Sequence, residues 1–293
     1  MAIRDEAFRL SSRREALTEE RRGGKRYFYF ERLSELGLKH RFSSIDSNLK
    51  ISGRENLPQL KRDWEELIQA TSQNYQRYYY MRQTHSSQVL PADGENLGKE
   101  GVLGRILSEP DGLMTERTDT LLSSSFGDCA PLLFLDPEKG VQANVHSGWR
   151  GTLANISGNC VRSMQAQYHC RPEALWVAIG PHIGREDFEV SEDVRSSFAT
   201  AYPELLPCEL IRPIENREGK YLIDLCLVIC YCLLSSGVVP EHILPCGRST
   251  VSEAGVFHSF RRDKEKFGLM MVISQLDGRF SGRNSSQTLE EDN

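Results

Sequence analysis

The stretch Leu121–Gly151, LLSSSFGDCAPLLFLDPEKGVQANVHSGWRG, decides how the rest of the chain is interpreted. Its two short apolar runs, Leu132–Asp136 and Val141–His146, flank Pro-Glu-Lys-Gly, and β-turns readily accept proline and glycine. The pattern predicts a β-hairpin. Because a hairpin brings its two ends together, we expect the thiol of Cys129 and the imidazole of His146 to lie close in space.

The residues after the hairpin predict a helix whose start binds anions. Apolar residues recur at helical spacing through Thr152–Tyr168, which follows Gly148-Trp149-Arg150-Gly151. The first N–H groups of a helix are unpaired and lie at the positive end of its dipole. Arg150 adds a cation there, so this one stretch is expected to supply a thiolate, an imidazole and an anion site.

Composition limits the class of protein. The 293 residues are 39% hydrophobic and 26% charged, which is enough for one sizeable core. The net charge of −5 and the absence of a basic stripe argue against a nucleic-acid partner. The chain has no run of 18 apolar residues and no apolar core of a signal peptide, so we expect no membrane partner. Eight cysteines in such a chain indicate reduced thiols in the cytoplasm.

One catalytic domain is expected over residues 26–277, between two tails. Residues 1–25 mix arginine and glutamate with few apolar residues, and residues 278–293 are polar and acidic. Both tails are therefore predicted to be disordered or solvated. A basic arm that binds a partner is the alternative for the first tail.

Between the tails, the chain contains both short apolar runs typical of strands and segments with helical spacing. The predicted strands include Tyr27–Phe30, Tyr78–Met81, Leu175–Ile179, Ile243–Pro245 and Leu269–Ile273, and the predicted helices include Leu57–Ala70, Glu192–Ala201 and Leu225–Ser236. His85 follows a predicted strand, where ligand-binding groups often lie. Cys226, Cys230 and Cys232 lack Cys-x-x-Cys spacing and are predicted to be core thiols.

Three scattered residues carry the candidate chemistry. His85, Cys129 and His146 supply two imidazoles and one thiolate, which match a catalytic zinc site that keeps a fourth position for water. A metal-free Cys–His hydrolase pair is the competing interpretation. Such a pair usually needs a third group that orients the histidine, and the sequence identifies none. Arg261 and Arg262 follow aromatic residues and are candidates either for holding an anionic group or for a solvated turn.

The chain resembles the laccase-domain, YfiH-like family from about Phe28 to Leu276. The motifs that carry the resemblance are Gln83-Thr84-His85, Asp111-Gly112-Leu113-Met114-Thr115, Gly127-Asp128-Cys129-Ala130-Pro131, Val145-His146-Ser147-Gly148-Trp149-Arg150-Gly151, Ile179-Gly180-Pro181-His182-Ile183-Gly184, Asp224-Leu225 and Phe257-His258-Ser259-Phe260-Arg261-Arg262-Asp263. The thiol segment and the Gly-Trp-Arg-Gly segment together are the specific part.

The resemblance implies a single α/β domain, a β-sheet core flanked by helices, related to the cytotoxic necrotizing factor deamidases. It implies a purine nucleoside phosphorylase that acts on adenosine, inosine and guanosine, with methylthioadenosine as a further candidate, and that also deaminates adenosine. It places zinc on His85, Cys129 and His146, which are then also the catalytic residues. Gln83, Arg150 and Arg261 become the candidates for binding the nucleoside or phosphate.

The chain departs from the family pattern at Ser86, Gly127, His182 and Ile45, where Ile45 stands in place of an arginine. The three ligands survive, so these changes bear on substrate choice, and we expect Ile45 and His182 to line the pocket. The family was once named for multicopper oxidase activity. Seven histidines and no His-x-His pair are too few for such copper sites, because imidazole is the main ligand of copper.

The sequence therefore favours a zinc-dependent enzyme that acts on purine nucleosides. Three alternatives stay open: an amidase that edits a cell-wall precursor, as some bacterial members of the family are described to do, a metal-free Cys–His hydrolase, and a metal-binding partner protein without catalytic activity. The sequence does not indicate an oligomeric state.

Overall fold

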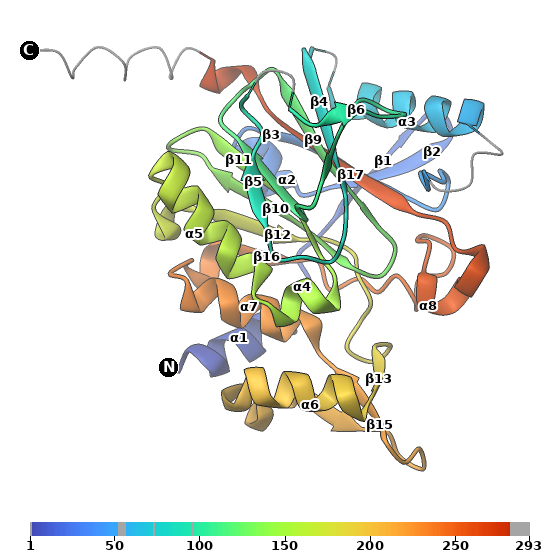
Figure 1. Ribbon diagram of the computed structural model, residues 1–293, viewed down its shortest axis with the longest axis vertical. Helices are drawn as coiled ribbons and strands as arrows, with labels where there is room; N and C mark the ends of the chain where they lie inside the picture. The colour runs from blue at the N-terminus through green and yellow to red at the C-terminus, as the bar shows by residue number, and fades with distance from the viewer. Residues whose placement is uncertain (1, 52–56, 73, 95–96, 282–293) are drawn as a thin grey trace, which may run out of the picture.

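Two β-sheets packed face to face form the centre of this computed structural model, which describes residues 2–51, 57–72, 74–94 and 97–281 (Figure 1). The larger sheet has the strand order β1 (Thr18–Arg22), β2 (Lys25–Tyr29), β3 (Leu38–Ser43), β17 (Met270–Leu276), β9 (Thr120–Phe126), β4 (Arg77–Arg82), β7 (Arg105–Ser108) and β6 (Lys99–Glu100). The smaller sheet has the order β16 (Ile243–Pro245), β12 (Trp176–Ile179), β10 (Ala130–Asp136), β11 (Val141–Ser147), β8 (Gly112–Thr115) and β5 (Val89–Pro91). A separate small sheet contains β13 (Glu189–Ser191), β15 (Lys220–Ile223) and β14 (Ile211–Pro213).

Helices cover the outer faces of both large sheets. On the larger sheet, α3 (Leu57–Thr71) buries its apolar stripe against aromatic residues of β4. On the smaller sheet, α5 (Ile156–Tyr168), α7 (Leu225–Ser235) and α1 (Ile3–Ser11) share one hydrophobic core with the strands. The remaining helices are α2 (Glu31–Glu35), α4 (Trp149–Leu153), α6 (Glu192–Ala201) and α8 (Phe260–Asp263). The predicted single α/β domain, with sheets flanked by helices, is confirmed.

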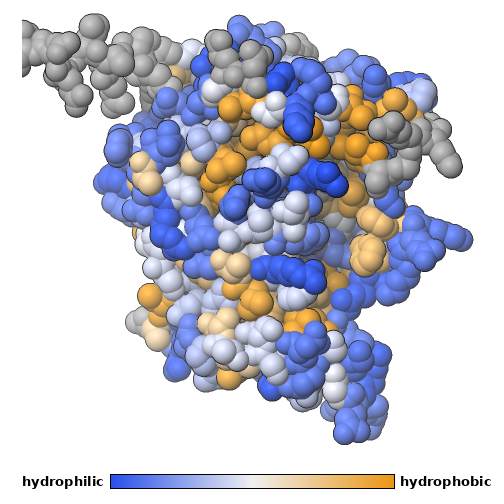
Figure 2. All heavy atoms as spheres, in the orientation of Figure 1, coloured by the Kyte–Doolittle hydropathy of each residue, from blue (hydrophilic) through white to orange (hydrophobic). Residues whose placement is uncertain are grey.

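Figure 2 shows hydrophobic side chains gathered in the upper part of one face, around β4 and α3. Trp64 and Val102 are among the partly buried residues that pack there against the core. Among the described residues, no helix combines the length and the apolar character needed to cross a bilayer.

The predicted hairpin is confirmed as β10 and β11, and its register places Pro131 opposite His146. Successive side chains of a strand alternate between its two faces. In β11, Ala143 and Val145 join the core beneath the helices, whereas the Asn144 amide donates to the Leu122 carbonyl of the larger sheet. His146 shares the parity of Asn144 and therefore faces the larger sheet.

The helix predicted over Thr152–Tyr168 is instead divided into α4 and α5. Asn155 adopts a left-handed conformation (φ 58°, ψ 46°) between them, and its side chain accepts a hydrogen bond from the Gly158 N–H at 2.9 Å. Asparagine adopts this conformation at low cost and is a good helix N-cap. The break leaves α4 as a five-residue helix, so the prediction of one continuous helix is wrong, whereas anion binding at its start stays a prediction.

The prediction that residues 1–25 form a disordered or solvated tail is wrong. Helix α1 buries Ala7 and Leu10 completely in the core that it shares with α7. Strand β1 then pairs with β2, joined through Gly23 and Gly24. Both glycines have positive φ (60° and 82°), which a two-residue hairpin turn requires and which glycine adopts without strain.

The second predicted tail, residues 278–293, begins with a 3₁₀ turn over Gly278–Phe280 that buries Phe280, so its first residues are ordered. Residues 282–293 lie outside the described part. The boundaries 26–277 stay a prediction.

The predicted core thiols are confirmed: Cys226, Cys230 and Cys232 are buried in α7, and all eight cysteines are free. This helix begins after Asp224, whose carboxylate accepts the Leu227 N–H at 3.0 Å.

Candidate metal centre

His85, Cys129 and His146 come together in the structure as the sequence predicted. Their ligand atoms all lie within 4.8 Å of one another. The Cys129 Sγ is 3.8 Å from the His85 Nε2, and the two imidazole ring centres are 5.1 Å apart. Among the described histidine, cysteine and acidic side chains, these three form a group that could hold a metal ion.

The two sheets contribute different ligands. His146 lies near the end of β11, and Cys129 directly precedes β10 beside it in the smaller sheet. His85 follows β4 of the larger sheet and has a left-handed backbone (φ 62°), which is uncommon for a residue other than glycine. The site therefore forms only when the two sheets are packed together.

A buried aspartate that the sequence did not reveal as a site residue holds this arrangement. Asp111 directly precedes β8 and has no exposed surface. Its Oδ1 accepts the N–H groups of Thr84 at 2.9 Å and His85 at 3.1 Å, and its Oδ2 accepts that of Ser86 at 2.6 Å. The same Oδ1 lies 3.4 Å from the His146 Nδ1, a buried nitrogen with no hydrogen bond of good geometry to the described residues.

These contacts shift the pKa values of the group. Burial opposes the charged forms, but the charges and hydrogen bonds between Cys129 and the two histidines outweigh it, so the pKa of Cys129 is lowered. The pKa of His146 is raised against burial, because Cys129 and Asp111 favour the imidazolium. The pKa of Asp111 stays low despite burial, because His146 and the backbone N–H groups stabilise the carboxylate. The thiol is thus poised to become a thiolate, the form that binds metals.

A glycine lets the backbone lie close to the ligands. A Cβ on Gly148 would lie 2.4 Å from the His85 Cδ2 and 3.1 Å from the Cys129 Sγ. Two imidazoles and a thiolate match the three-ligand donor set of catalytic zinc sites. The residues therefore fit a zinc ion, which His85, Cys129 and His146 would hold.

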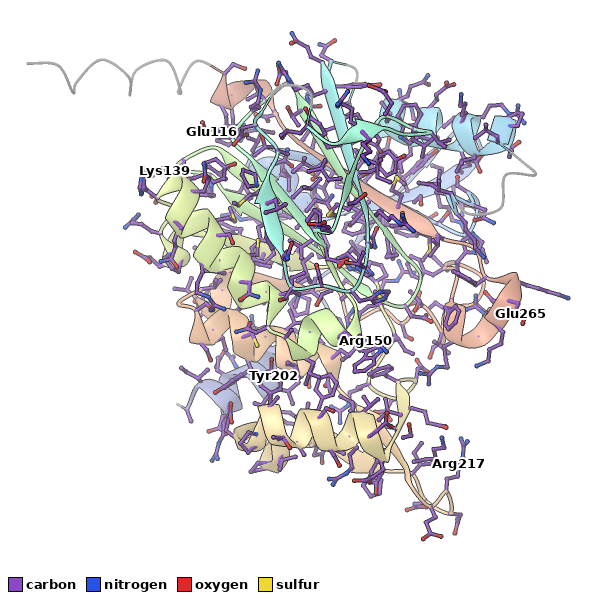
Figure 3. The ribbon with its side chains drawn as sticks, in the orientation of Figure 1. Glu116, Lys139, Arg150, Tyr202, Arg217 and Glu265 are labelled. Atoms are coloured by element: carbon purple, nitrogen blue, oxygen red, sulfur yellow. The ribbon has the colours of Figure 1, made fainter. Side chains whose placement is uncertain are left out.

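The three predicted substrate-binding residues lie in different surroundings. Arg150 is exposed on α4, with its guanidinium 4.3 Å from the centre of the Trp149 ring and no hydrogen bond or ion pair among the described residues (Figure 3). Both ends of the Gln83 amide pair with the backbone of Ser125 at 2.7 Å. Both hydrogen-bonding groups of the amide are therefore used to hold the end of β9. The substrate-binding roles of both residues stay predictions.

Arg261 lies at the side of the cluster occupied by Cys129. Its backbone N–H donates to the Asp128 Oδ2 at 2.6 Å, and its Nη1 donates to the Glu189 carbonyl at 2.8 Å. The other Asp128 oxygen accepts the Thr250 hydroxyl at 2.7 Å. Asp128 thus fastens α8 to the turn that carries Cys129, a role that sequence reasoning also missed. A role for Arg261 in anion binding stays a prediction.

The two departures expected to line the pocket differ in their surroundings. His182 is only 4% exposed, and its Nδ1–H donates to the Gly180 carbonyl at 2.8 Å. It lies beside Cys226, and its place in the substrate pocket stays a prediction. Ile45 is half-buried, and its N–H donates to the Val256 carbonyl at 2.8 Å.

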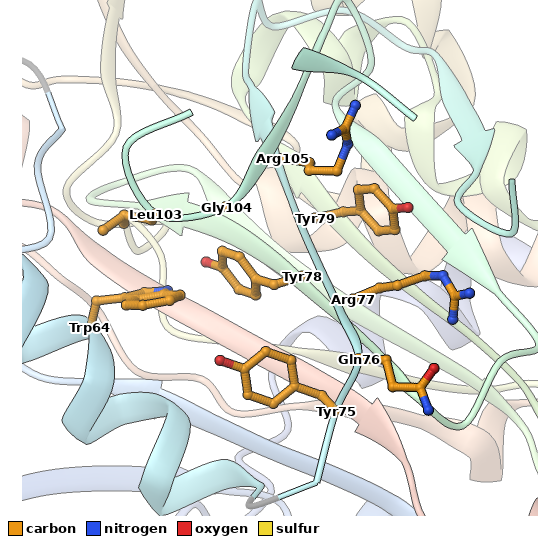
Figure 4. A pocket seen from close by; sticks show the side chains of 9 residues that line it. All are labelled: Trp64, Tyr75, Gln76, Arg77, Tyr78, Tyr79, Leu103, Gly104 and Arg105. Carbon is orange, nitrogen blue, oxygen red and sulfur yellow. The ribbon is translucent and has the colours of Figure 1, made fainter. Parts of the chain in front are cut away.

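A separate hollow of about 490 Å³ lies beside Trp64, Tyr75 and Tyr78, where β4 begins (Figure 4). The His85 loop follows the opposite end of the same six-residue strand, about 20 Å away at the usual rise per residue. On the rim of the hollow, Arg77 forms an ion pair with Asp119, and Arg105 forms one with Glu100. The hollow is therefore distinct from the metal centre.

Comparison with known proteins gives a consistent match. A family model described as multi-copper polyphenol oxidoreductase laccase matches residues 35–277. A Geobacillus stearothermophilus protein named purine nucleoside phosphorylase YlmD is 37% identical over 163 residues, which cover 56% of this chain and 58% of that protein. The chain thus matches little more than half the length of that relative. A Bacillus subtilis protein of the same name is 27% identical over 232 residues, covering 78% of this chain and 81% of its own length.

Solved structures share the fold. The crystal structure of YlmD from Geobacillus stearothermophilus superposes with a TM-score of 0.78 at 25% identity, and covers 89% of this chain and 99% of its own. Protein NMB0706 from Neisseria meningitidis gives a TM-score of 0.69 at 26% identity, with 83% and 95% covered.

Proposed function

Because the chain belongs to the multi-copper polyphenol oxidoreductase laccase family, in which several relatives are named purine nucleoside phosphorylases, we propose that it is a zinc-dependent purine nucleoside phosphorylase. The observation that carries this proposal is the convergence of His85, Cys129 and His146 in a chain with such relatives. We further propose adenosine, inosine, guanosine and methylthioadenosine as substrates, and the cytoplasm as the location.

In the proposed reaction, phosphate attacks the anomeric carbon of the ribose, the bond from that carbon to the purine nitrogen breaks, and ribose 1-phosphate and the free base leave. Zinc held by the three ligands supplies a Lewis acid to the site. With water as the nucleophile, the same site is proposed to convert adenosine to inosine with release of ammonia.

Arg150 is the candidate that binds phosphate. It lies two residues after Gly148, which borders the ligands, and its guanidinium is exposed and has no acidic partner among the described residues. Stacking on Trp149 restricts a flexible side chain, so less conformational entropy is lost when an anion binds. Arg261 is the second candidate cation, on the side of the cluster where Asp128 holds its backbone.

The test is an assay of the purified protein on purine nucleosides, with and without phosphate and with and without a zinc chelator. We expect free base and ribose 1-phosphate only when phosphate is present, and loss of both after chelation. A protein that releases no base from any purine nucleoside under these conditions would refute the proposal. Cleavage of a cell-wall precursor carrying L-serine in place of L-alanine would then favour the amidase.

One observation supports a second candidate, the metal-free Cys–His hydrolase. The third group that the sequence lacked is present, because Asp111 lies 3.4 Å from the His146 Nδ1, on the side of a histidine that an orienting carboxylate occupies in Cys–His–Asp sites. This candidate predicts hydrolysis that persists after chelation and disappears in Cys129→Ala. The zinc enzyme loses activity in both conditions, so the chelator separates the two.

A further inference from the structure

We propose that Asp111 is a positioning residue that sets both histidine ligands of the metal centre. This inference rests on the proposed function, because it takes His85 and His146 as ligands of one ion. Asp111 itself is not proposed to contact the metal or the substrate. Its carboxylate acts through the groups that it holds.

The first of these groups is the loop that carries His85. The N–H groups of three consecutive residues, Thr84, His85 and Ser86, converge on one carboxylate at 2.6–3.1 Å. Hydrogen bonds to a buried, ionised carboxylate are short and about twice as strong as those between neutral groups. They offset the conformational cost of the left-handed backbone at His85, a conformation that is unfavourable for a residue other than glycine. The hydroxyl groups of Thr84 and Ser86 also donate to the Glu109 carbonyl, but the Asp111 carboxylate is the group that binds the His85 N–H itself.

The second group is the His146 ring. The register of β8 and β11 pairs Gly112 with Val145, and the His146 N–H donates to the Asp111 carbonyl at 2.7 Å. The backbone of Asp111 thus fixes the position of His146, and its side chain faces the Nδ1 of the ring at 3.4 Å. That contact leaves the Nε2 of His146 as the nitrogen for the metal. Histidine ligands commonly give their other nitrogen to a carboxylate in this way.

The position of Asp111 between the sheets explains why one residue can hold both the His85 loop and the His146 ring. It directly precedes a strand of the smaller sheet, and it binds a loop that leaves the larger sheet. The two histidines come from these two different sheets, so a small slip of one sheet over the other would separate them. The carboxylate joins the sheets at the point where the ligands meet. Asp128 has no such role for the histidines, because its carboxylate binds Thr250 and the backbone of Arg261.

The experiment compares zinc affinity in the full-length wild type, Asp111→Asn and Asp63→Asn. Asparagine keeps the size of the side chain but places an NH₂ group where N–H donors converge. Asp63 is the matched control, since it is also buried and accepts hydrogen bonds from Lys25 and Gln59 away from the metal centre. Zinc affinity is measured by competition with a chromogenic chelator, and the absorption spectrum of the cobalt-substituted protein reports ligand geometry without any turnover.

We expect Asp111→Asn to bind zinc about 10–100-fold more weakly and to show an altered cobalt spectrum. Asp63→Asn is expected to lower the melting temperature but to keep the wild-type affinity and spectrum. Wild-type affinity and spectrum in Asp111→Asn would overturn the inference and leave the proposed function intact. Failure of the wild type to bind zinc would overturn the metal centre and the inference together.

If Asp111→Asn does not fold, nitrogen NMR of the imidazoles in the zinc-loaded wild type decides the question. The inference requires the proton of His146 on Nδ1 and the metal on Nε2. Metal bound to Nδ1 of His146 would overturn it.

Discussion

Adding a single methyl group to Gly148 is expected to disable the metal centre while the fold remains intact. Gly148 has φ −71° and ψ 167°, which alanine adopts without strain, so Gly148→Ala changes only the space beside the ligands. The new Cβ would lie 2.4 Å from the His85 Cδ2, whereas carbon atoms in contact are about 3.5–4.0 Å apart. The imidazole would therefore have to move by about 1 Å or more, and the new Cβ would also lie 3.1 Å from the Cys129 Sγ.

Such a movement is large for a metal site. Ligand distances there are held within about 0.2 Å, and a misplacement of about 1 Å at a catalytic group costs on the order of 100-fold in rate. We expect Gly148→Ala to lose zinc affinity by at least about tenfold and phosphorolysis, as kcat/KM, by about 100-fold. Zinc content, chelator competition and nucleoside assays measure these effects, and the melting temperature of the metal-free protein reports the fold.

Gly255→Ala is the matched control, because a Cβ there meets nothing within 4 Å and its φ is outside the left-handed region. It should keep zinc, turnover and melting temperature. Gly148→Ala with the zinc affinity and turnover of the control would refute the steric argument. Loss of folding in the metal-free Gly148→Ala protein would show instead that Gly148 serves the fold.

Four further predictions test separate parts of the structure. Elemental analysis should find one zinc per chain, and Cys129→Ala should reduce it strongly; copper in several equivalents would restore the oxidase interpretation. Arg150→Ala should raise the apparent constant for phosphate about 10–100-fold, since a charge-assisted hydrogen bond contributes roughly 1.5–3 kcal/mol, and should leave the melting temperature nearly unchanged; unaltered phosphate dependence would contradict the assigned role. His146→Ala should abolish phosphorolysis and the phosphate-independent deamination of adenosine together, and deamination that survives would place it at another site. Burial lowers the pKa of His40 to about 4, and its Nε2 accepts the Phe30 N–H, so the folded state holds this ring neutral. Below pH 6.5 this histidine is protonated in the unfolded chain only, so the wild type should lose about 3 kcal/mol of stability between pH 6.5 and 4. Chemical denaturation of the wild type and of His40→Asn over this pH range measures the effect, and the variant should lack this part of the pH dependence.

Local sequence patterns were sufficient to predict an element of the fold where that element and the partner it packs against lie close in sequence. The hairpin of β10 and β11 could be predicted because two apolar runs flank a turn, and the meeting of Cys129 with His146 followed from it. Strand β9 gave no comparable pattern, because its buried Ser123 and Ser124 resemble loop residues. They are tolerated in the core since Tyr78 and Asn144 satisfy their hydroxyl groups, and both partners are distant in sequence.

The first helix was missed for a related reason. In α1, Ala7 and Leu10 are the fully buried apolar residues, and Glu6 is also buried, so the helix presents a narrow stripe within a charged segment. Its place is determined by α7, which lies far along the chain. A short helix with so little apolar surface forms through such packing rather than by propensity.

Asp111 shows why the metal centre itself was only partly predictable. The sequence contains every ligand, and alternation along β11 directs His146 toward the larger sheet, where the loop of His85 lies. An aspartate before a glycine also resembles an ordinary turn, and nothing local distinguishes a carboxylate that accepts three backbone N–H groups from one that is solvated. Only the packing of the two sheets brings Thr84, His85 and Ser86 to Asp111. The ligands of such a site can thus be identified from residue type, whereas the groups that orient them depend on long-range packing.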